Sequence, residues 1–125
     1  MNNEKKVLLI EDNVSVVETL SRALECRGFE VLPAFAGEIG LKRAREKRPD
    51  IILLDISLPG IDGYTVCEKL KEDPELSRIP VVMLTGRDRG EDFEKGMDKK
   101  ADWYIVKPCR IEHLLKVFER LLVQS

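Results

Sequence analysis

Five short apolar runs alternate along the chain with longer segments in which apolar residues recur at helical spacing. We expect the runs to be strands, and they cover residues 7–10, 30–32, 51–54, 81–84 and 103–106. The first, third and fourth are nearly continuous aliphatic runs, which is typical of parallel strands covered on both faces. The alternation therefore predicts an α/β domain with parallel strands, right-handed crossovers and helices on both faces of the sheet.

Five helices are predicted between and after these runs. They cover residues 14–27, 38–47, 64–71, 91–99 and 110–123. The last has the clearest apolar stripe, and Gly28 is a natural end for the first. Gly40 lies inside the second helix and should weaken it by about 1 kcal/mol relative to alanine. The fourth is the weakest prediction, because it has few large apolar residues and contains Gly96.

Length and charge limit the classes of function. A chain of 125 residues is long enough for one domain with a real core, and we expect a single domain over residues 1–125. The formal net charge of −2 argues against direct nucleic-acid binding. No apolar run approaches the roughly 20 residues that span a bilayer. Cys26, Cys67 and Cys109 are far apart and odd in number, so we interpret them as reduced thiols of a cytoplasmic protein.

Polar residues follow four of the five predicted strands. They are Glu11 and Asp12 after the first, Asp55 after the third, Thr85 after the fourth, and Lys107 with Pro108 after the fifth. In open parallel sheets the functional crevice lies beyond the carboxyl ends of the strands. We therefore expect three carboxylates, a hydroxyl and an ammonium group to converge there.

This combination of side chains favours metal-assisted phosphoryl chemistry. Three clustered carboxylates need a cation, and all-oxygen ligation favours a hard one such as Mg²⁺. Lys107 offers a fixed positive charge to a phosphoryl group, and Thr85 offers a hydrogen-bond donor. A carboxylate such as Asp55 can itself be the nucleophile and form an aspartyl phosphate.

Four segments of the chain resemble the signature segments of response-regulator receiver domains. They are residues 8–13, 49–63, 79–86 and 101–108, in the order and approximate spacing of that family. No single segment is decisive, but the four together are highly specific, and the resemblance covers the whole chain. It implies a doubly wound, flavodoxin-like fold with a five-stranded parallel sheet of order 2-1-3-4-5 and five helices on two faces.

The resemblance also implies a role for each residue of the expected site. Asp55 matches the phosphorylated aspartate. Glu11, Asp12, Asp55 and the backbone carbonyl of Ser57 match the ligands of Mg²⁺, for which Mn²⁺ can substitute. Thr85 and Lys107 match the residues that contact the phosphoryl group, and Thr85 and Tyr104 match the pair that switches on phosphorylation. Pro108 matches a proline that follows a cis peptide bond.

Partners follow from the same resemblance. The donor would be a phosphohistidine on a sensor histidine kinase or a phosphotransfer protein, and the product would hydrolyse slowly. The fourth helix, fifth strand and fifth helix would relay the signal to a downstream protein partner or form a phosphorylation-dependent dimer. Such a chain is a signalling phosphoacceptor and not a conventional enzyme.

The residues that depart from the family pattern, Lys100, Trp103 and Cys109, fall on or beside this output surface. Ser57 and Arg87 occupy variable positions that flank the pocket.

Simpler interpretations exist for several of these residues. Asp12 alone could be a helix cap or turn residue, and Asp62 with Gly63 is expected to form a turn and cap the third helix. Tyr104 could be an ordinary strand aromatic. His113, the only histidine, is expected to be a partly buried or surface residue and not a phosphodonor.

Three other functions are compatible with a fold of this kind. A Mg²⁺-dependent phosphatase would have a second aspartate two residues after the nucleophile, where this chain has Ser57. A flavin-binding domain would have a hydroxyl- and glycine-rich loop after the first strand, where this chain has the charged Glu11 and Asp12. A receiver that signals by contacts alone would not need the complete residue set.

Overall fold

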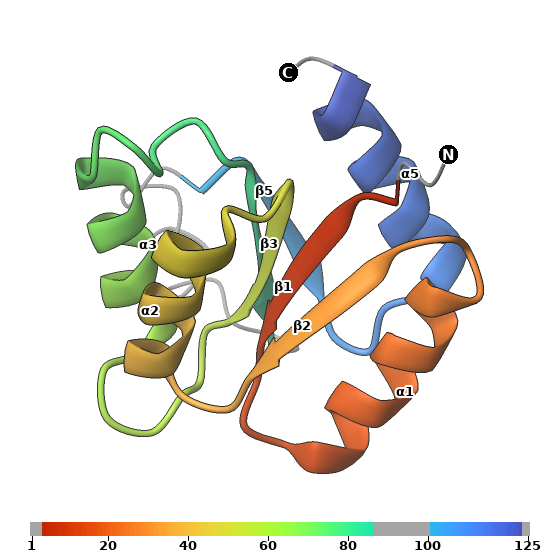
Figure 1. The fold of residues 1–125 in the computed structure, drawn as a ribbon. Helices are drawn as coiled ribbons and strands as arrows, with labels where there is room; N and C mark the ends of the chain where they lie inside the picture. The colour runs from red at the N-terminus through yellow and green to blue at the C-terminus, as the bar shows by residue number, and fades with distance from the viewer. Residues whose placement is uncertain (1–3, 87–100, 124–125) are drawn as a thin grey trace.

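The computed structural model describes residues 4–86 and 101–123 and has a central parallel sheet. Its order is β2-β1-β3-β4-β5, which confirms the predicted order (Figure 1). The strands are β1 (Lys6–Ile10), β2 (Glu30–Ala34), β3 (Ile51–Asp55), β4 (Val81–Thr85) and β5 (Trp103–Val106). Neighbouring strands pair in parallel throughout, so all five carboxyl ends lie at one edge of the sheet.

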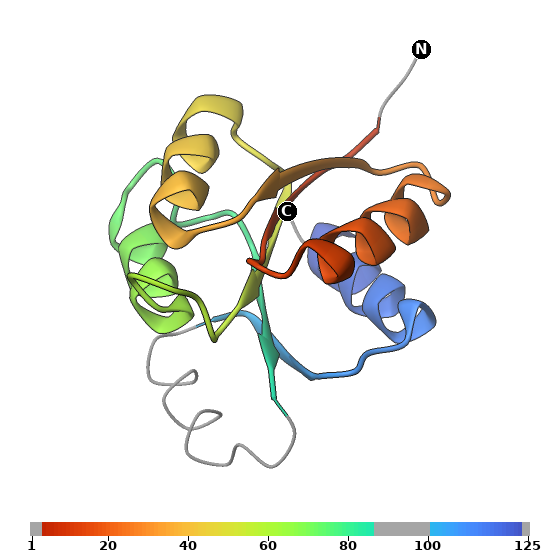
Figure 2. The same cartoon turned by 90° about the horizontal axis from the view of Figure 1, so that it is seen from below.

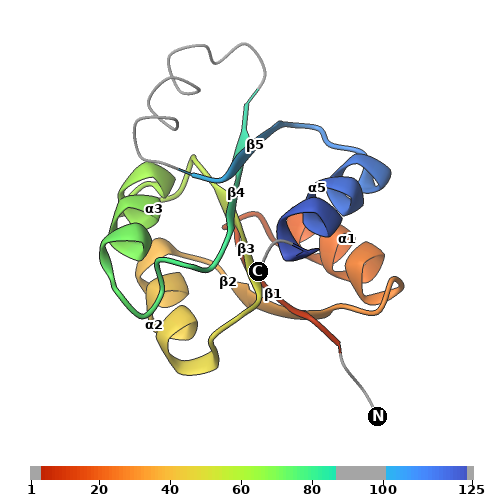
Figure 3. The same cartoon turned by 90° about the horizontal axis from the view of Figure 1, so that it is seen from above.

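Helices cover both faces of this sheet. They are α1 (Val14–Glu25), α2 (Gly37–Lys47), α3 (Gly63–Glu72) and α5 (Ile111–Val123). Seen from above, α1 and α5 lie on one face and α2 and α3 on the other (Figure 3). The helix predicted over residues 91–99 lies outside the described residues, as do Arg87 and Lys100. Among the helices described, none is long and apolar enough to cross a membrane.

The aliphatic strands divide the core into two apolar layers. Successive residues of a strand point to opposite faces, so β1 and β3 contribute alternately to each layer. Leu8 and Ile52 belong to the layer under α2 and α3, whereas Leu9 and Leu53 belong to the layer under α1 and α5. All four are completely buried, which explains why these strands have continuous aliphatic sequences.

Two details of the fold differ from what the sequence pattern suggests. Strand β2 extends through Pro33 and Ala34, beyond the predicted residues 30–32. It is an edge strand, where a proline without a backbone N–H can be accommodated. Gly40, which looked like a weak point of α2, lies where a Cβ atom would collide with the Ile10 side chain. The glycine therefore lets α2 pack closely on β1.

A polar clamp holds the amino ends of β4 and β5 to the end of α3. The Lys71 Nζ atom donates to the Ser77 carbonyl at 3.2 Å, the Ile79 carbonyl at 3.1 Å and Asp102 Oδ2 at 2.8 Å. Asp102 Oδ2 also accepts from the Val81 backbone N–H at 2.7 Å. A single oxygen of Asp102 thus accepts from both Lys71 and Val81, and it fixes the start of β5 beside β4.

Replacement of Asp102 should lower stability. In Asp102→Ala both the Lys71 ammonium and the Val81 N–H lose their shared acceptor, which should cost about 1–3 kcal/mol of unfolding free energy. Asp102→Asn keeps an acceptor oxygen without the charge, so its loss should be smaller. Urea unfolding followed by circular dichroism measures both. Equal stability of Asp102→Ala and the parent chain would contradict a structural role for this clamp.

Candidate functional site

The carboxyl ends of β1, β3, β4 and β5 bring the polar residues of the sequence prediction to one edge of the sheet, the end viewed in Figure 2. Backbone hydrogen bonds continue past the strand ends there. The Glu11 N–H donates to the Ala34 carbonyl at 2.9 Å, and the Lys107 N–H donates to the Thr85 carbonyl at 2.7 Å. The residues that follow the strands are therefore held almost as firmly as the strands themselves.

Three carboxylates form a cluster at this edge. Glu11, Asp12 and Asp55 each offer one oxygen atom, and these atoms lie within 4.8 Å of one another. Glu11 is 1% exposed and Asp55 is 4% exposed, whereas Asp12 faces solvent. Such a set of hard oxygen donors, partly open to solvent, fits a divalent cation that keeps some of its water.

Lys107 links the two buried acids. Its Nζ atom lies 3.0 Å from Asp55 Oδ2 and 3.2 Å from Glu11 Oε1. Burial by itself lowers the pKa of Lys107, but hydrogen bonding and attraction to Asp55, and then to Glu11, outweigh it. The pKa of Lys107 is therefore raised above its usual value, and the side chain stays cationic.

The surroundings of Glu11 disfavour its ionised form. Burial raises the pKa of its carboxyl group, a hydrogen bond from the Asn13 N–H lowers it, the nearby Asp55 raises it, and Lys107 lowers it. The net result is a raised pKa, because burial dominates. The ionised form of Glu11 is thus disfavoured in the protein without metal, and a bound cation would reverse that preference.

Turn residues fix the direction of these acids. The Asn13 N–H donates to Glu11 Oε2 at 3.1 Å, and Asn13 Oδ1 accepts from Val16 N–H at the start of α1. Asn13, and not Asp12, is therefore the cap of α1. Beyond β3, the Ser57 N–H donates to Asp55 Oδ1 at 3.2 Å. This backbone donor was not among the predicted site groups, because an N–H group leaves no mark in a single sequence.

Thr85 and Tyr104 lie on adjacent strands. Thr85 ends β4, is 2% exposed, and pairs in register with Val106. Tyr104 pairs with Met83, and both pack in the layer under α2 and α3. Since residues two apart in a strand share a face, Thr85 and Tyr104 lie on the same side of the sheet.

The other predicted residues have simple structural positions. The peptide bond between Lys107 and Pro108 is cis. Asp62 caps α3, because its Oδ1 atom accepts from the Thr65 N–H at 2.8 Å, as the simpler interpretation expected. His113 is exposed on α5. Trp103 and Cys109 are half-buried and pack against the layer under α1 and α5.

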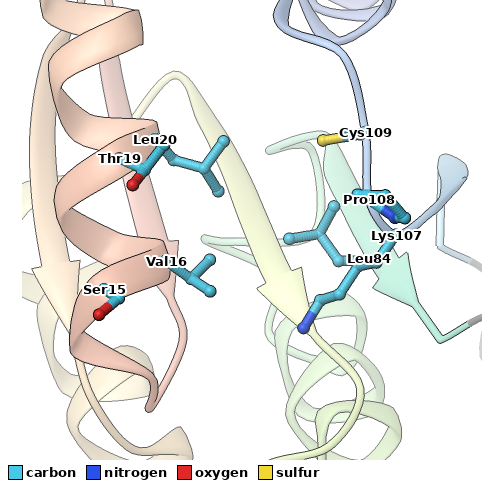
Figure 4. A pocket seen from close by; sticks show the side chains of 8 residues that line it. All are labelled: Ser15, Val16, Thr19, Leu20, Leu84, Lys107, Pro108 and Cys109. Atoms are coloured by element: carbon cyan, nitrogen blue, oxygen red, sulfur yellow. The ribbon is translucent and has the colours of Figure 1, made fainter.

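An apolar pocket adjoins the acidic cluster on the side of α1. It has a volume of about 480 Å³ and lies between Val16 and Leu20 of α1 and the segment from Lys107 to Cys109 (Figure 4). Lys107 forms part of its wall and extends from it toward the carboxyl end of β3 (Figure 4). The ammonium group therefore has an apolar wall on one side and the acids on the other. Burial also raises the pKa of the Cys109 thiol in this wall, although a backbone hydrogen bond and Lys107 lower it.

Comparison with known proteins gives consistent matches. Residues 7–119 match the response regulator receiver domain family. The chain is 38% identical to the DNA-binding dual master transcriptional regulator RpaA of Synechocystis, over 94% of this chain and 48% of that protein. It is 35% identical to protein PilH of Pseudomonas aeruginosa, over 94% of this chain and 97% of that protein. The chain spans about half the length of RpaA and several other curated relatives.

Solved structures match as well. A putative response regulator from Chloroflexus aurantiacus superposes with a TM-score of 0.93 at 30% identity, over 97% of this chain and 99% of that one. The chemotaxis response regulator CheY4 of Vibrio cholerae superposes with a TM-score of 0.88 at 30% identity, over 96% of this chain and 100% of that one. The fold of this chain is thus shared with solved response regulators along nearly its whole length.

Neutralisation of Glu11 should stabilise the metal-free protein in a pH-dependent way. Because the native pKa of Glu11 is raised, its ionisation as the pH rises through that value removes stability. Glu11→Gln should therefore be more stable at pH 7 by about 0.5–2 kcal/mol, the usual range for a single stabilising substitution. The gain should shrink as the pH falls toward 4.5 and Glu11 takes up its proton. Urea unfolding in EDTA across this range measures it, and a variant less stable than the parent at pH 7 would contradict the explanation.

The Cys109 thiol should lose its proton at a higher pH in the native protein than in the unfolded chain. In Cys26→Ser/Cys67→Ser only Cys109 remains, and its thiolate reacts with iodoacetamide. Because burial raises its pKa, the pH–rate curve of the native protein should lie at higher pH than that of the same chain in urea. Coincident curves would show that the pocket does not affect the thiol.

Proposed function

The chain belongs to the response regulator receiver family, and on this basis we propose that Asp55 accepts a phosphoryl group from a phosphohistidine in a Mg²⁺-dependent reaction. A receiver of this kind is a signalling phosphoacceptor and not a conventional enzyme. The observation that carries the proposal is the position of the Asp55 carboxylate, which lies beside Glu11 and Asp12 and 3.0 Å from the Lys107 ammonium.

The donor set suits the metal that the family implies. Glu11, Asp12, Asp55 and the Ser57 carbonyl would hold Mg²⁺, and Mn²⁺ would be able to take its place. The cation would offset negative charge on the phosphoryl oxygens. Two buried acids beside a solvent-facing one leave room for water and for a phosphoryl oxygen as further ligands.

The protein's own residues perform the rest of the reaction. An Asp55 carboxylate oxygen forms a bond to phosphorus as the phosphorus–nitrogen bond of the phosphohistidine breaks. The donor ring carries a proton on its other nitrogen, so it leaves with the electron pair of the broken bond as neutral imidazole. Lys107 remains cationic because its pKa is raised, and it attracts both the carboxylate and the incoming phosphoryl group. The Thr85 hydroxyl, buried at the end of β4, would donate to a phosphoryl oxygen.

Signal output would pass from Thr85 to Tyr104. Their position on one face of adjacent strands supports a coupled movement, in which a phosphoryl group draws Thr85 inward and Tyr104 follows. The fifth strand and the helices beside it would then contact a downstream protein or a second copy of the chain. The donor would be a sensor histidine kinase or phosphotransfer protein in the cytoplasm. We propose no nucleic-acid contact by residues 1–125 themselves, although relatives with longer chains, such as RpaA, are DNA-binding regulators.

Incubation with acetyl phosphate and Mg²⁺ tests the chemistry directly. Intact-mass spectrometry should find one added phosphoryl group, which EDTA prevents. Asp55→Asn should remain unmodified, because an amide is a far weaker nucleophile than a carboxylate. Asp50→Asn is the matched control, since Asp50 is adjacent to the opposite end of the same strand and accepts the Lys6 N–H at 2.7 Å.

Either of two results would refute the proposal. One is an unmodified parent chain both with acetyl phosphate and with a cognate kinase. The other is modification that persists in Asp55→Asn. Continuous release of phosphate from small esters would instead favour the phosphatase interpretation.

A further inference from the structure

The first turn of α3 lies directly against the backbone of the phosphoacceptor. Helix α3 begins at Gly63, and a Cβ atom at this position would collide with the Asp55 carbonyl oxygen. It would also lie 2.7 Å from Ile56 Cα and 3.0 Å from the Asp55 carbonyl carbon. These are backbone atoms, which cannot rotate away as the end of a side chain can. Only a glycine fits at position 63 without moving the Asp55–Ile56 peptide.

That peptide is held from both sides. The Gly63 N–H donates to the Ile56 carbonyl at 2.9 Å, and the Ile56 N–H donates to the Leu84 carbonyl of β4 at 3.2 Å. The Asp62 cap fixes the first turn of α3 through the Thr65 N–H. The segment that carries Asp55 is thus fixed between β4 and α3. Its close contact with α3 is possible because Gly63 has no side chain.

The direction of the Asp55 carboxylate depends on this backbone. Asp55 Oδ1 accepts from the Ser57 N–H, two residues along the same segment, and Asp55 Oδ2 lies 3.0 Å from Lys107. A shift of the Asp55–Ile56 peptide would move both oxygens relative to Lys107 and Glu11. Misplacement of a reacting group by about 1 Å can lower a rate by roughly 100-fold.

We infer that Gly63 is a positioning residue for phosphoryl transfer, because its lack of a side chain sets the place of the Asp55 carboxylate and of the Ser57 backbone. The inference rests on the proposed function. It assigns Gly63 a role distinct from that of Asp62, which caps the helix, and from turn formation in general. Its φ angle is not in the left-handed region, so the requirement is one of space.

Other glycines of the chain provide a contrast. The three atoms nearest to a Cβ at Gly40 belong to the side chain of Ile10, whereas those nearest to a Cβ at Gly63 belong to the backbone. Gly28, in the turn between α1 and β2, has a φ of +91° and nothing within 4 Å of its Cβ position. Gly28→Ala therefore strains the backbone far from the acidic cluster and adds no collision, so it serves as the control for a general loss of stability.

The experiment compares Gly63→Ala, Gly28→Ala and the parent chain. Phosphorylation by acetyl phosphate is followed over a Mg²⁺ titration, and urea unfolding identifies conditions in which each protein is fully folded. In folded Gly63→Ala we expect the rate at saturating Mg²⁺ to fall by about tenfold or more and the half-saturating Mg²⁺ concentration to rise several-fold. The Ser57 amide should also shift in ¹H–¹⁵N spectra. Gly28→Ala should unfold at lower urea but keep both kinetic values within about twofold of the parent, because its strain is remote.

Each outcome bears on one claim. If the parent chain is not phosphorylated, the proposed function fails and Gly63 is not at issue. If the parent is phosphorylated and folded Gly63→Ala retains both kinetic values within about twofold, the positioning role is wrong. If Gly63→Ala does not fold in buffer, all three proteins are measured in trimethylamine N-oxide, an excluded osmolyte that favours the folded state. Folded Gly63→Ala should still need more Mg²⁺ and react more slowly than Gly28→Ala and the parent, and parental values there would overturn the inference.

Discussion

The site depends on the Lys107 ammonium, which lies between two buried carboxylates. Glu11 and Asp55 come from different strands, and like charges at this distance in a poorly solvated place repel each other. Lys107, from a third strand, contacts both and offsets part of that repulsion. The parallel sheet brings these three strand ends to one edge, so the sheet order and the electrostatics of the site are parts of one arrangement.

Much of this could be predicted from the sequence. Continuous aliphatic runs identify buried parallel strands, and the polar residues that follow them must then meet at one edge. The predicted sheet order is confirmed, and Glu11, Asp12, Asp55 and Lys107 do converge. The convergence could be predicted because it depends on periodicity and on position along a strand, both of which a single sequence records. The sheet order was implied by the resemblance to receiver domains and not by periodicity.

Other features could not be predicted, because they depend on a backbone N–H group or on how one element packs against another. The Ser57 N–H that donates to Asp55 would be present with any residue except proline at that position. Gly40 looked like a defect of a helix until its packing against Ile10 was known. The predicted strand covered residues 30–32, yet β2 is an edge strand and continues through Pro33. For Gly40 and Pro33 the place of the residue in the fold decides the role, and a single sequence does not record that place.

The ionised carboxylate of Glu11 lowers the stability of the metal-free protein, whereas the proposed function requires it. A residue chosen for stability alone at this buried position would be neutral, since burial disfavours the carboxylate more than Lys107 and Asn13 favour it. Under the proposed function the acid would serve a cation that shares the site, and the same burial would then strengthen its attraction to that cation. The proposed function, and not the stability of the fold, accounts for an ionisable acid at a position where burial raises its pKa. Gly63 is a second residue of this kind. Its lack of a side chain lets α3 approach the Asp55 backbone, where a Cβ atom would collide with the Asp55 carbonyl oxygen.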